Sequence, residues 1–217
     1  QLKLHQKPCA VLNVNGYYDP LMSFLDQATN QEFLSMANRN LLLQAAKPED
    51  LLEREVSISI NDKNYTGRIG ETILDVAKRN NIDIPHLCFK DGMRPDGNCR
   101  ACVVEIEGER TLQPSCVRTI SEGMKIQTSN KKVVHSQKLV LELLGSDISD
   151  KTYNSDSELD FWSKNLGVSE SRFPSKIQDK HDSTHPAISV NLDACIQCTR
   201  CVRACREEQV NDVIGYA

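Results

Sequence analysis

Eight of the nine cysteines in this 217-residue chain fall into two groups of four. The first group has the spacing C-x10-C-x2-C-x13-C and consists of Cys88, Cys99, Cys102 and Cys116. Four thiolates that come from one loop and from across a fold can hold two irons bridged by two sulfides. Structural zinc sites usually take their ligands as two closely spaced pairs, whereas Cys88 and Cys116 are solitary. We therefore predict a 2Fe-2S cluster on this group, with structural zinc as the alternative.

The second group lies in "CIQCTRCVRAC" and consists of Cys195, Cys198, Cys201 and Cys205. Its spacing, C-x2-C-x2-C-x3-C, is typical of a 4Fe-4S cluster, and three consecutive short gaps suit a single tetrahedral zinc ion poorly. In proteins with two such clusters, the fourth cysteine of the run binds the neighbouring cluster. No cysteine follows Cys205, so we expect the 4Fe-4S ligand set to be incomplete in this chain, which would make the chain a fragment.

Composition narrows the classes of protein. The 26 basic and 30 acidic residues give a net charge of -4, so neither nucleic acid nor an anionic membrane is an expected partner. Without a long apolar run or a secretory signal, we predict a cytoplasmic protein with no membrane insertion. In that reducing compartment clustered cysteines indicate metal binding rather than disulfides. No nucleophile constellation or phosphate loop is recognisable, so we predict no catalytic residue in this chain and leave its status as an enzyme open.

Residues 1–53 have the pattern of a strand, a helix, a second strand and a second helix. The strands are "AVLNV" and "LLLQA", and we expect the first helix to open with Asp19 as N-cap and Pro20 at its first position. Pro48 suits the start of the second helix. A segment of this size buries little core alone, so we interpret it as an α/β remnant of a larger sheet domain.

Residues 54–130 predict an α+β domain in which a helix covers a small mixed sheet. Strands are expected at "VSISI", "YTGRI", "CVVEIEGE", "TLQPS" and "MKIQT". The helix "ETILDVAKRNN" has Thr72 and Asp75 as a capping pair. The first cysteine group lies in the loops of this domain, where Gly92 and Gly97 would let main-chain N–H groups approach the sulfurs.

Two segments complete the chain. Residues 131–187 read as a helix followed by a polar linker, and a short helix at "SELDFWSKNLG" carries Trp162 as a packing anchor. Residues 188–217 read as the first half of a 4Fe-4S ferredoxin-type domain. His86 precedes Cys88 by two residues, but a Rieske centre needs two imidazoles, so we expect His86 beside the cluster or on the surface.

From about Val56 onward the chain resembles the amino-terminal region of the alpha subunit of NAD-dependent, molybdenum-containing formate dehydrogenase. The residues that carry the likeness are "PHLCFKDGMRPDGNCRACVVEIEGERTLQPSCVR" and "NLDACIQCTRCVRACREEQVNDVIG". The resemblance implies a β-grasp 2Fe-2S domain on the first group and a 4Fe-4S domain opened by the second. It also implies a molybdopterin site further along the family's chain, and partner subunits that bind flavin and NAD or carry small iron-sulfur domains.

Two related families share the first domain, and they remain alternatives: the diaphorase subunit of NAD-reducing hydrogenase and the large subunit of complex I. Many of those chains insert a cluster held by one His and three Cys between the two groups. Residues 117–194 contain no cysteine, which disfavours the complex I alternative.

The stretch from His5 to Glu55, "HQKPCAVLNVNGYYDPLMSFLDQATNQEFLSMANRNLLLQAAKPEDLLERE", is similar to the carboxy-terminal end of the LOG family. These are nucleotide phosphoribohydrolases that were once described as lysine decarboxylases. The resemblance implies a Rossmann-like remnant over residues 1–53, and the family's catalytic residues lie upstream of it. A phosphoribohydrolase fragment is therefore a further alternative function.

Overall fold

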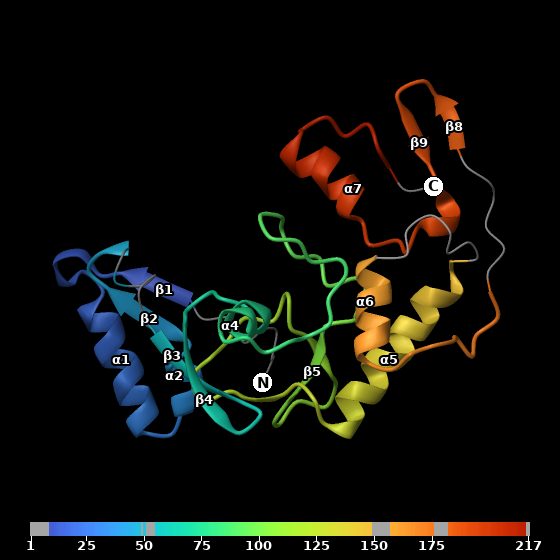
Figure 1. The fold of residues 1–217 in the computed structure, drawn as a ribbon. Coiled ribbons are helices and arrows are strands. Elements are labelled where there is room, and N and C mark those ends of the chain that lie inside the picture. The colour runs from blue at the N-terminus through green and yellow to red at the C-terminus, as the bar shows by residue number, and fades with distance from the viewer. Residues whose placement is uncertain (1–8, 49, 51–54, 149–156, 176–181, 216–217) are drawn as a thin grey trace. The chain divides into compact units, whose positions relative to one another are not determined.

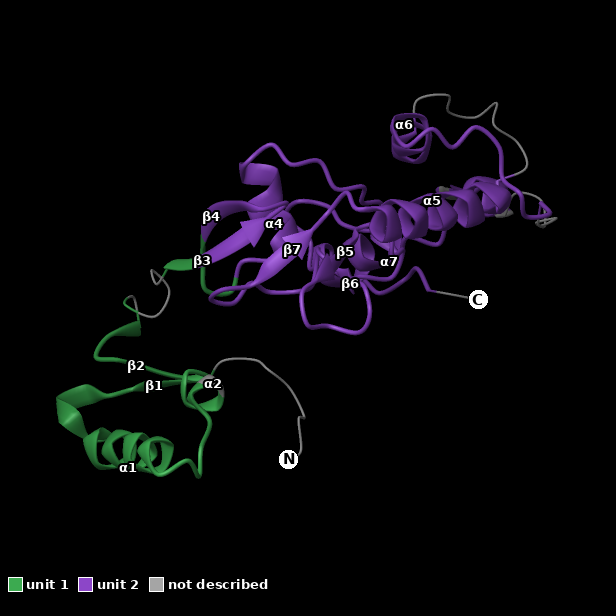
Figure 2. Cartoon of the chain, turned by 90° about the horizontal axis from the view of Figure 1, so that it is seen from below, with its two compact units in different colours: residues 1–56, 67–70 green, residues 57–66, 71–217 purple. Residues whose placement is uncertain are grey.

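The computed structural model describes residues 9–48, 50, 55–148, 157–175 and 182–215. The chain separates into two compact units (Figure 2). The first comprises residues 1–56 and 67–70, and the second comprises residues 57–66 and 71–217. Within the described residues, no helix has the length and apolar composition needed to cross a membrane.

The first unit contains two parallel strands and the helices that connect them (Figure 1). Their bounds are β1 (Cys9–Leu12), η1 (Val14–Gly16), α1 (Asp19–Asn30), α2 (Met36–Arg39) and β2 (Leu42–Ala45). The parallel pairing of β1 with β2 through a helical connection agrees with the predicted α/β pattern. The helix expected after Pro48 falls largely outside the described residues.

One detail of this prediction is wrong. Asp19 is the first residue of α1, and the N-cap is Tyr18. The carboxylate of Asp19 accepts a hydrogen bond from Nδ2 of Asn13 at 2.7 Å, and the Asn13 Oδ1 accepts one from the Tyr18 amide at 2.7 Å. Asn13 therefore holds the chain at the helix entrance, which leaves the Asp19 side chain directed at Asn13 rather than at the helix amides.

The second unit is built around a five-stranded mixed sheet in the order β4-β3-β7-β5-β6. The strands and the helix that follows β4 are β3 (Glu55–Ile60), β4 (Lys63–Arg68), α4 (Ile73–Arg79), β5 (Val103–Ile106), β6 (Gln113–Pro114) and β7 (Lys125–Gln127). β7 pairs with β3 in parallel and with β5 in antiparallel orientation. This arrangement confirms the predicted α+β class, while the more specific β-grasp assignment stays a prediction.

The core of this sheet follows the periodicities of the sequence. In β3, Val56, Ile58 and Ile60 are buried, as an alternating strand requires. On α4, the apolar residues from Ile73 to Ala77 are buried, and the predicted capping box of Thr72 and Asp75 is present. The helix therefore begins where the sequence places it and lays one apolar face on the core.

Two further helices lie side by side in this unit (Figures 1 and 2), α5 (Lys131–Ser146) and α6 (Glu158–Asn165). Leu141 of α5 and Leu159 of α6 are buried together with Leu87 and Ala101 from the cysteine loop, and Trp162 packs against this cluster. The predicted role of Trp162 as an anchor is confirmed. The remaining elements are β8 (Asp182–His185), β9 (Ile188–Val190), η3 (Leu192–Ala194), α7 (Arg200–Arg203) and the π-helical turn η4 (Ala204–Glu208).

Candidate iron-sulfur site

The four cysteines of the first group lie in two connecting segments of the sheet, one before β5 and one after β6. Cys88 and Cys99 lie in the long loop between α4 and β5, Cys102 directly precedes β5, and Cys116 follows β6. Cys88, Cys102 and Cys116 are buried, and Cys99 is partly exposed. The antiparallel pairing of β5 with β6, with the Ser115 amide donating to the Cys102 carbonyl at 3.0 Å, brings Cys116 next to Cys102.

The amino terminus of α4 fixes the position of Cys116. The Leu74 amide donates to the Ser115 carbonyl at 3.0 Å, and the Ile73 amide donates to the Arg118 carbonyl at 2.9 Å. The first amides of a helix have no partner within the helix, so here they hold the residues on both sides of Cys116. The capping box at Thr72 supports this geometry because it defines where α4 begins.

The four sulfurs lie close enough to share protons. Hydrogen bonds from Cys116 and then Cys99 lower the pKa of Cys88 to about 2. A hydrogen bond from Cys116 also lowers the pKa of Cys102 to about 7. These hydrogen bonds have the opposite effect on the other two thiols. The contact with Cys88 raises the pKa of Cys99, and the contact with Cys102 raises the pKa of Cys116. The first group is therefore a connected cluster of thiols in which Cys88 and Cys102 favour the thiolate, the form that binds metal, while Cys99 and Cys116 favour the thiol.

Main-chain amides also face these sulfurs. The Cys88 amide donates to Sγ of Cys99 at 3.4 Å. Amides of Cys99 and Asn98 lower the pKa of Cys88 beyond the effect of the other thiols, and the Ala101 amide acts in the same direction on Cys99. N–H groups directed at sulfur stabilise its charged form and are one means by which proteins set the reduction potential of a cluster.

The two glycines of the loop have different roles. Both have positive φ, +83° at Gly92 and +67° at Gly97. A Cβ on Gly97 would lie 3.2 Å from a methyl group of Val117, whereas one on Gly92 would meet nothing within 4 Å. Gly97 therefore allows the loop to approach the residue that follows Cys116, while Gly92 serves only the backbone conformation.

The donor set fits an iron-sulfur cluster, because it offers four soft thiol ligands. His86 is placed beside it and not among the sulfurs: its Nδ1 lies 2.8 Å from the Ile84 carbonyl, and its ring packs against Phe89 and Trp162. Nowhere in the described residues are three or more His, Cys, Asp or Glu side chains gathered as a single metal ion would require. A 2Fe-2S cluster has a different requirement, since each of its two irons takes two thiolates.

The second group is not brought together in the same way. Cys205 is buried, Cys195 and Cys198 are partly buried, and Cys201 is exposed. Gln197 and Thr199, on either side of Cys198, both have positive φ, so the backbone reverses sharply within this run. The 4Fe-4S cluster predicted on these four residues stays a prediction. Cys9, which stands apart from both groups, is exposed on β1.

Sequence reasoning missed the polar residues that join the two cysteine segments. Arg203 is buried, with an exposed fraction of 4%, and it contacts the loop that holds Cys88. Thr199 donates to Oδ2 of Asp96 at 2.9 Å across the same junction. Arginine is usually exposed, so its presence within a cysteine run gives no sign of burial.

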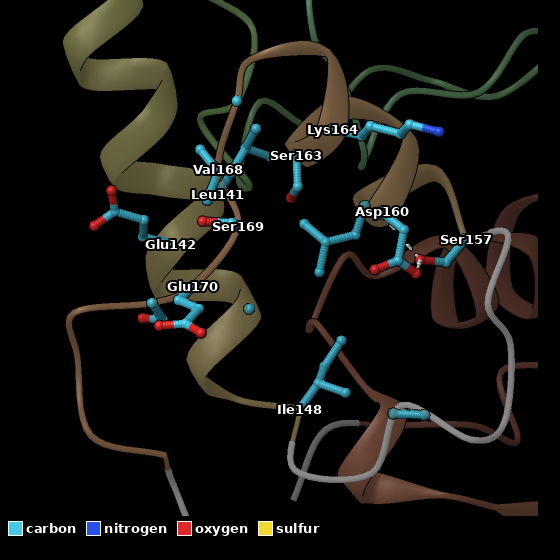
Figure 3. A pocket seen from close by; sticks show the side chains of 15 residues that line it. Leu141, Glu142, Ile148, Ser157, Asp160, Ser163, Lys164, Val168, Ser169 and Glu170 are labelled. Atoms are coloured by element: carbon cyan, nitrogen blue, oxygen red, sulfur yellow. Dashed lines mark hydrogen bonds between the residues drawn. The ribbon is translucent and has the colours of Figure 1, made fainter.

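A cavity of about 600 Å³ lies between α5 and α6 and contains no cysteine in its lining (Figure 3). Three of its polar side chains have partners: Ser157 and Asp160 hydrogen-bond to each other, and Glu142 forms an ion pair with Arg172. The chemistry that the cysteines indicate therefore lies outside this cavity.

Two family models match separate parts of the chain. The family model "2Fe-2S iron-sulfur cluster binding domain" matches residues 53–131, which include the whole first cysteine group. A second family model, "Possible lysine decarboxylase", matches residues 1–54. The two matches meet at residues 53 and 54.

Similar proteins come from several classes of oxidoreductase. The chain is 34% identical over 161 residues to an NADH-quinone oxidoreductase protein of Rhizobium meliloti, covering 70% of this chain and 19% of that protein. A formate dehydrogenase-like protein of Bacillus subtilis is 26% identical over 172 residues, covering 75% of this chain and 17% of that protein. The chain thus spans less than a fifth of the length of these relatives.

A solved structure also matches. The crystal structure of an NAD+-reducing [NiFe]-hydrogenase in the H2-reduced state has a chain with a TM-score of 0.67 and 27% identity, covering 75% of this chain and 71% of that one. The formate dehydrogenase resemblance is therefore one of several, and the comparisons do not single it out. Within this chain, residues 53–131 therefore match a 2Fe-2S iron-sulfur cluster binding domain.

Proposed function

We propose that this chain transfers electrons through a 2Fe-2S cluster held by Cys88, Cys99, Cys102 and Cys116. The observation that carries the proposal is the contact among these four thiols, three of them buried, inside the segment that matches the 2Fe-2S domain. A bound cluster of this type supplies reversible one-electron oxidation and reduction.

The residues of the chain have separate tasks in this function. The thiols hold the irons, and the amides of Asn98, Cys99 and Ala101 stabilise the negative charge that accumulates on sulfur. Leu87 and Ala101, both fully buried, keep water from the inner side of the loop. Cys99 is partly exposed, so its side of the site is the one from which an electron would enter or leave.

We further propose that the chain works within a multi-subunit, NAD-linked oxidoreductase. The named relatives support this, as does the likeness to formate dehydrogenase. In that assembly the partners would be flavin/NAD-binding and small iron-sulfur subunits, and a molybdopterin site would belong to another part of the enzyme. A 4Fe-4S cluster on Cys195, Cys198, Cys201 and Cys205 and a cytoplasmic location are part of the same proposal.

Two other functions have their own support. The structural match favours an NAD-reducing hydrogenase as the second candidate enzyme. Residues 1–54 match the lysine decarboxylase-like family, and their parallel β1–β2 pair suits a remnant of a LOG-type phosphoribohydrolase. Hydrolysis of a nucleoside monophosphate by the purified chain would favour that remnant as the active part.

The test is anaerobic purification of the chain followed by iron and sulfide analysis and electron paramagnetic resonance (EPR). We expect iron and acid-labile sulfide in equal amounts and a 2Fe-2S signal after reduction. Cys102→Ser should lose or strongly alter this signal, whereas Cys9→Ser, a change at an exposed cysteine outside both groups, should leave it intact. A folded protein that contains zinc and no sulfide would refute the proposal.

A further inference from the structure

The loop of the 2Fe-2S domain and the second cysteine run are joined by a dense set of polar contacts. Arg94 pairs with Glu207 at 2.9 Å, and Nη2 of Arg200 donates to the Phe89 carbonyl at 2.6 Å. Nδ2 of Asn98 donates to the Gln197 carbonyl at 3.3 Å. All of these contacts join residues between Cys88 and Cys99 to residues between Cys195 and η4, so the two cysteine segments are held together as one piece.

Arg203 is the buried centre of this junction. One of its terminal nitrogens donates to the carbonyl of Cys88, and the other donates to the carbonyl of Arg94. Its Nε donates to the hydroxyl of Thr199 at 3.1 Å. Each of its three nitrogens therefore has an acceptor, and two of these acceptors are backbone carbonyls of the cysteine loop. A planar guanidinium can make this forked contact, and a lysine cannot.

The charge of Arg203 has little compensation from carboxylates. The ion pair found for it in the described part of the chain is with Asp96, whose Oδ2 lies 4.0 Å from Nε. The Asp96 side chain is 28% exposed, against 5% for that of Arg203. Buried charges are normally paired, because removing a cation from water is costly. On the side of Cys88 its partner is the main-chain carbonyl of that residue, so the guanidinium lies beside the cysteine loop.

We infer that Arg203 is a positioning residue for the 2Fe-2S site: it clamps the Cys88 loop to the second cysteine run and keeps a buried positive charge beside Cys88. This inference rests on the proposed function, since it concerns the same cluster. Reduction adds negative charge to the site, and a nearby fixed cation favours the reduced form. Arg203 therefore raises the midpoint potential of the cluster and restrains the loop that surrounds it.

The test uses the whole 217-residue chain, with EPR-monitored redox titration and hydrogen exchange of the amides between Cys88 and Cys99. In Arg203→Met both the charge and the hydrogen bonds are lost. We expect its midpoint potential to fall by about 59 mV, which corresponds to a roughly tenfold change in the ratio of reduced to oxidised cluster. Exchange of the loop amides should also become faster, because local opening of the loop no longer breaks the hydrogen bonds of Arg203.

Two further variants separate the effects. Arg203→Lys keeps the charge but not the forked contact, so we expect faster loop exchange with a smaller fall in potential. Arg206→Gln removes a positive charge three residues away that is 56% exposed and paired with Asp212, so it controls for net charge. The Arg206→Gln chain should match the wild type in both measurements.

The outcomes distinguish this inference from the proposed function. If the wild-type chain binds no 2Fe-2S cluster, the proposed function fails. If the cluster forms but Arg203→Met has the potential and loop exchange of the Arg206→Gln control, the inference about Arg203 is refuted. Should Arg203→Met fail to fold, Arg203→Lys decides the matter, because unchanged loop exchange in that variant would also refute the clamp.

Discussion

The capping box of α4 offers a direct test of how the helix supports the cysteine site. The Thr72 hydroxyl accepts a hydrogen bond from the Asp75 amide at 3.2 Å, and the Asp75 carboxylate accepts one from the Thr72 amide at 2.9 Å. Thr72→Ala removes the first bond, together with the bond that the Thr72 hydroxyl donates to the Asp75 carboxylate at 2.7 Å, and leaves the second. Because the helix that it caps holds Ser115 and Arg118, which lie on either side of Cys116, the substitution should weaken the site as well as the fold.

The size of the effect follows from the contacts that are lost. Loss of an N-cap hydroxyl typically costs about 1 kcal/mol. Thr72 is only 9% exposed, so water would not fully replace the bond. For a domain of this size, about 1 kcal/mol corresponds to a fall in Tm of about 4–8 °C and to an unfolded fraction increased about fivefold.

The assay combines urea denaturation of the metal-free chain, followed by circular dichroism, with the rate at which a chelator removes iron from the loaded chain. Thr72→Ser retains the hydroxyl and is the matched control. We expect Thr72→Ala to unfold at lower urea concentration and to lose iron several times faster, about in proportion to the fivefold change in the unfolded fraction. If Thr72→Ala and Thr72→Ser release iron at the same rate, the link between the cap and Cys116 is wrong.

Three further changes have expected outcomes. Gly97→Ala should destabilise the loaded chain by more than Gly92→Ala. Positive φ costs an alanine about 1 kcal/mol at either position, but only at Gly97 is there too little space for the added Cβ. Gln137→Ala should cost about 1–3 kcal/mol in urea denaturation, because the buried Gln137 amide donates to the Val103 carbonyl at 3.0 Å. In the metal-free chain, ultraviolet thiolate absorbance should persist well below the ordinary thiol pKa, because neighbouring thiols lower the pKa of Cys88 to about 2.

The predictions for Gln137→Ala and for the Cys88 thiolate each have a control. His135→Ala changes an exposed residue on the same helix as Gln137, so it should leave the free energy of unfolding nearly unchanged. Equal effects of the two substitutions would contradict the role given to Gln137. For the thiolate, a lowered folded pKa means that the charged form, and any stability it provides, is lost only as the pH falls towards the folded value. Because the pKa of Cys102 is itself lowered to about 7, the decisive range lies well below pH 7: absorbance that disappears before that range, or that survives there in Cys88→Ser, would be inconsistent with this.

Much of the second unit could be predicted because its signals are local. The alternation of Val56, Ile58 and Ile60 fixed β3, and the pair Thr72 and Asp75 fixed the start of α4. The spacing of the first cysteine group indicated a 2Fe-2S domain without any structure, and the family match confirmed the domain. These features need only residues within a few positions of one another, or a count of the residues between cysteines.

The features that could not be predicted depend on contacts between distant residues. The burial of Arg203 results from carbonyls that lie more than a hundred residues earlier in the chain. The side chain of Asp19 was expected to cap α1, but it lost that role to a contact with Asn13. Sequence patterns give the polarity of a residue and its neighbours along the chain, whereas burial of an arginine or the choice between two acceptors depends on the folded surroundings.

The place of β7 in the sheet affects how the metal centre can mature. β7 is the last strand of the five to be synthesised, yet it lies in the middle, between β3 and β5. Until the ribosome has released residues Lys125–Gln127, the strand that follows Cys102 has no neighbour on one side, and the two halves of the sheet cannot join. Iron delivery to this domain should therefore follow translation of the whole sheet, and until then the folded sheet cannot shield the cysteines of the nascent chain.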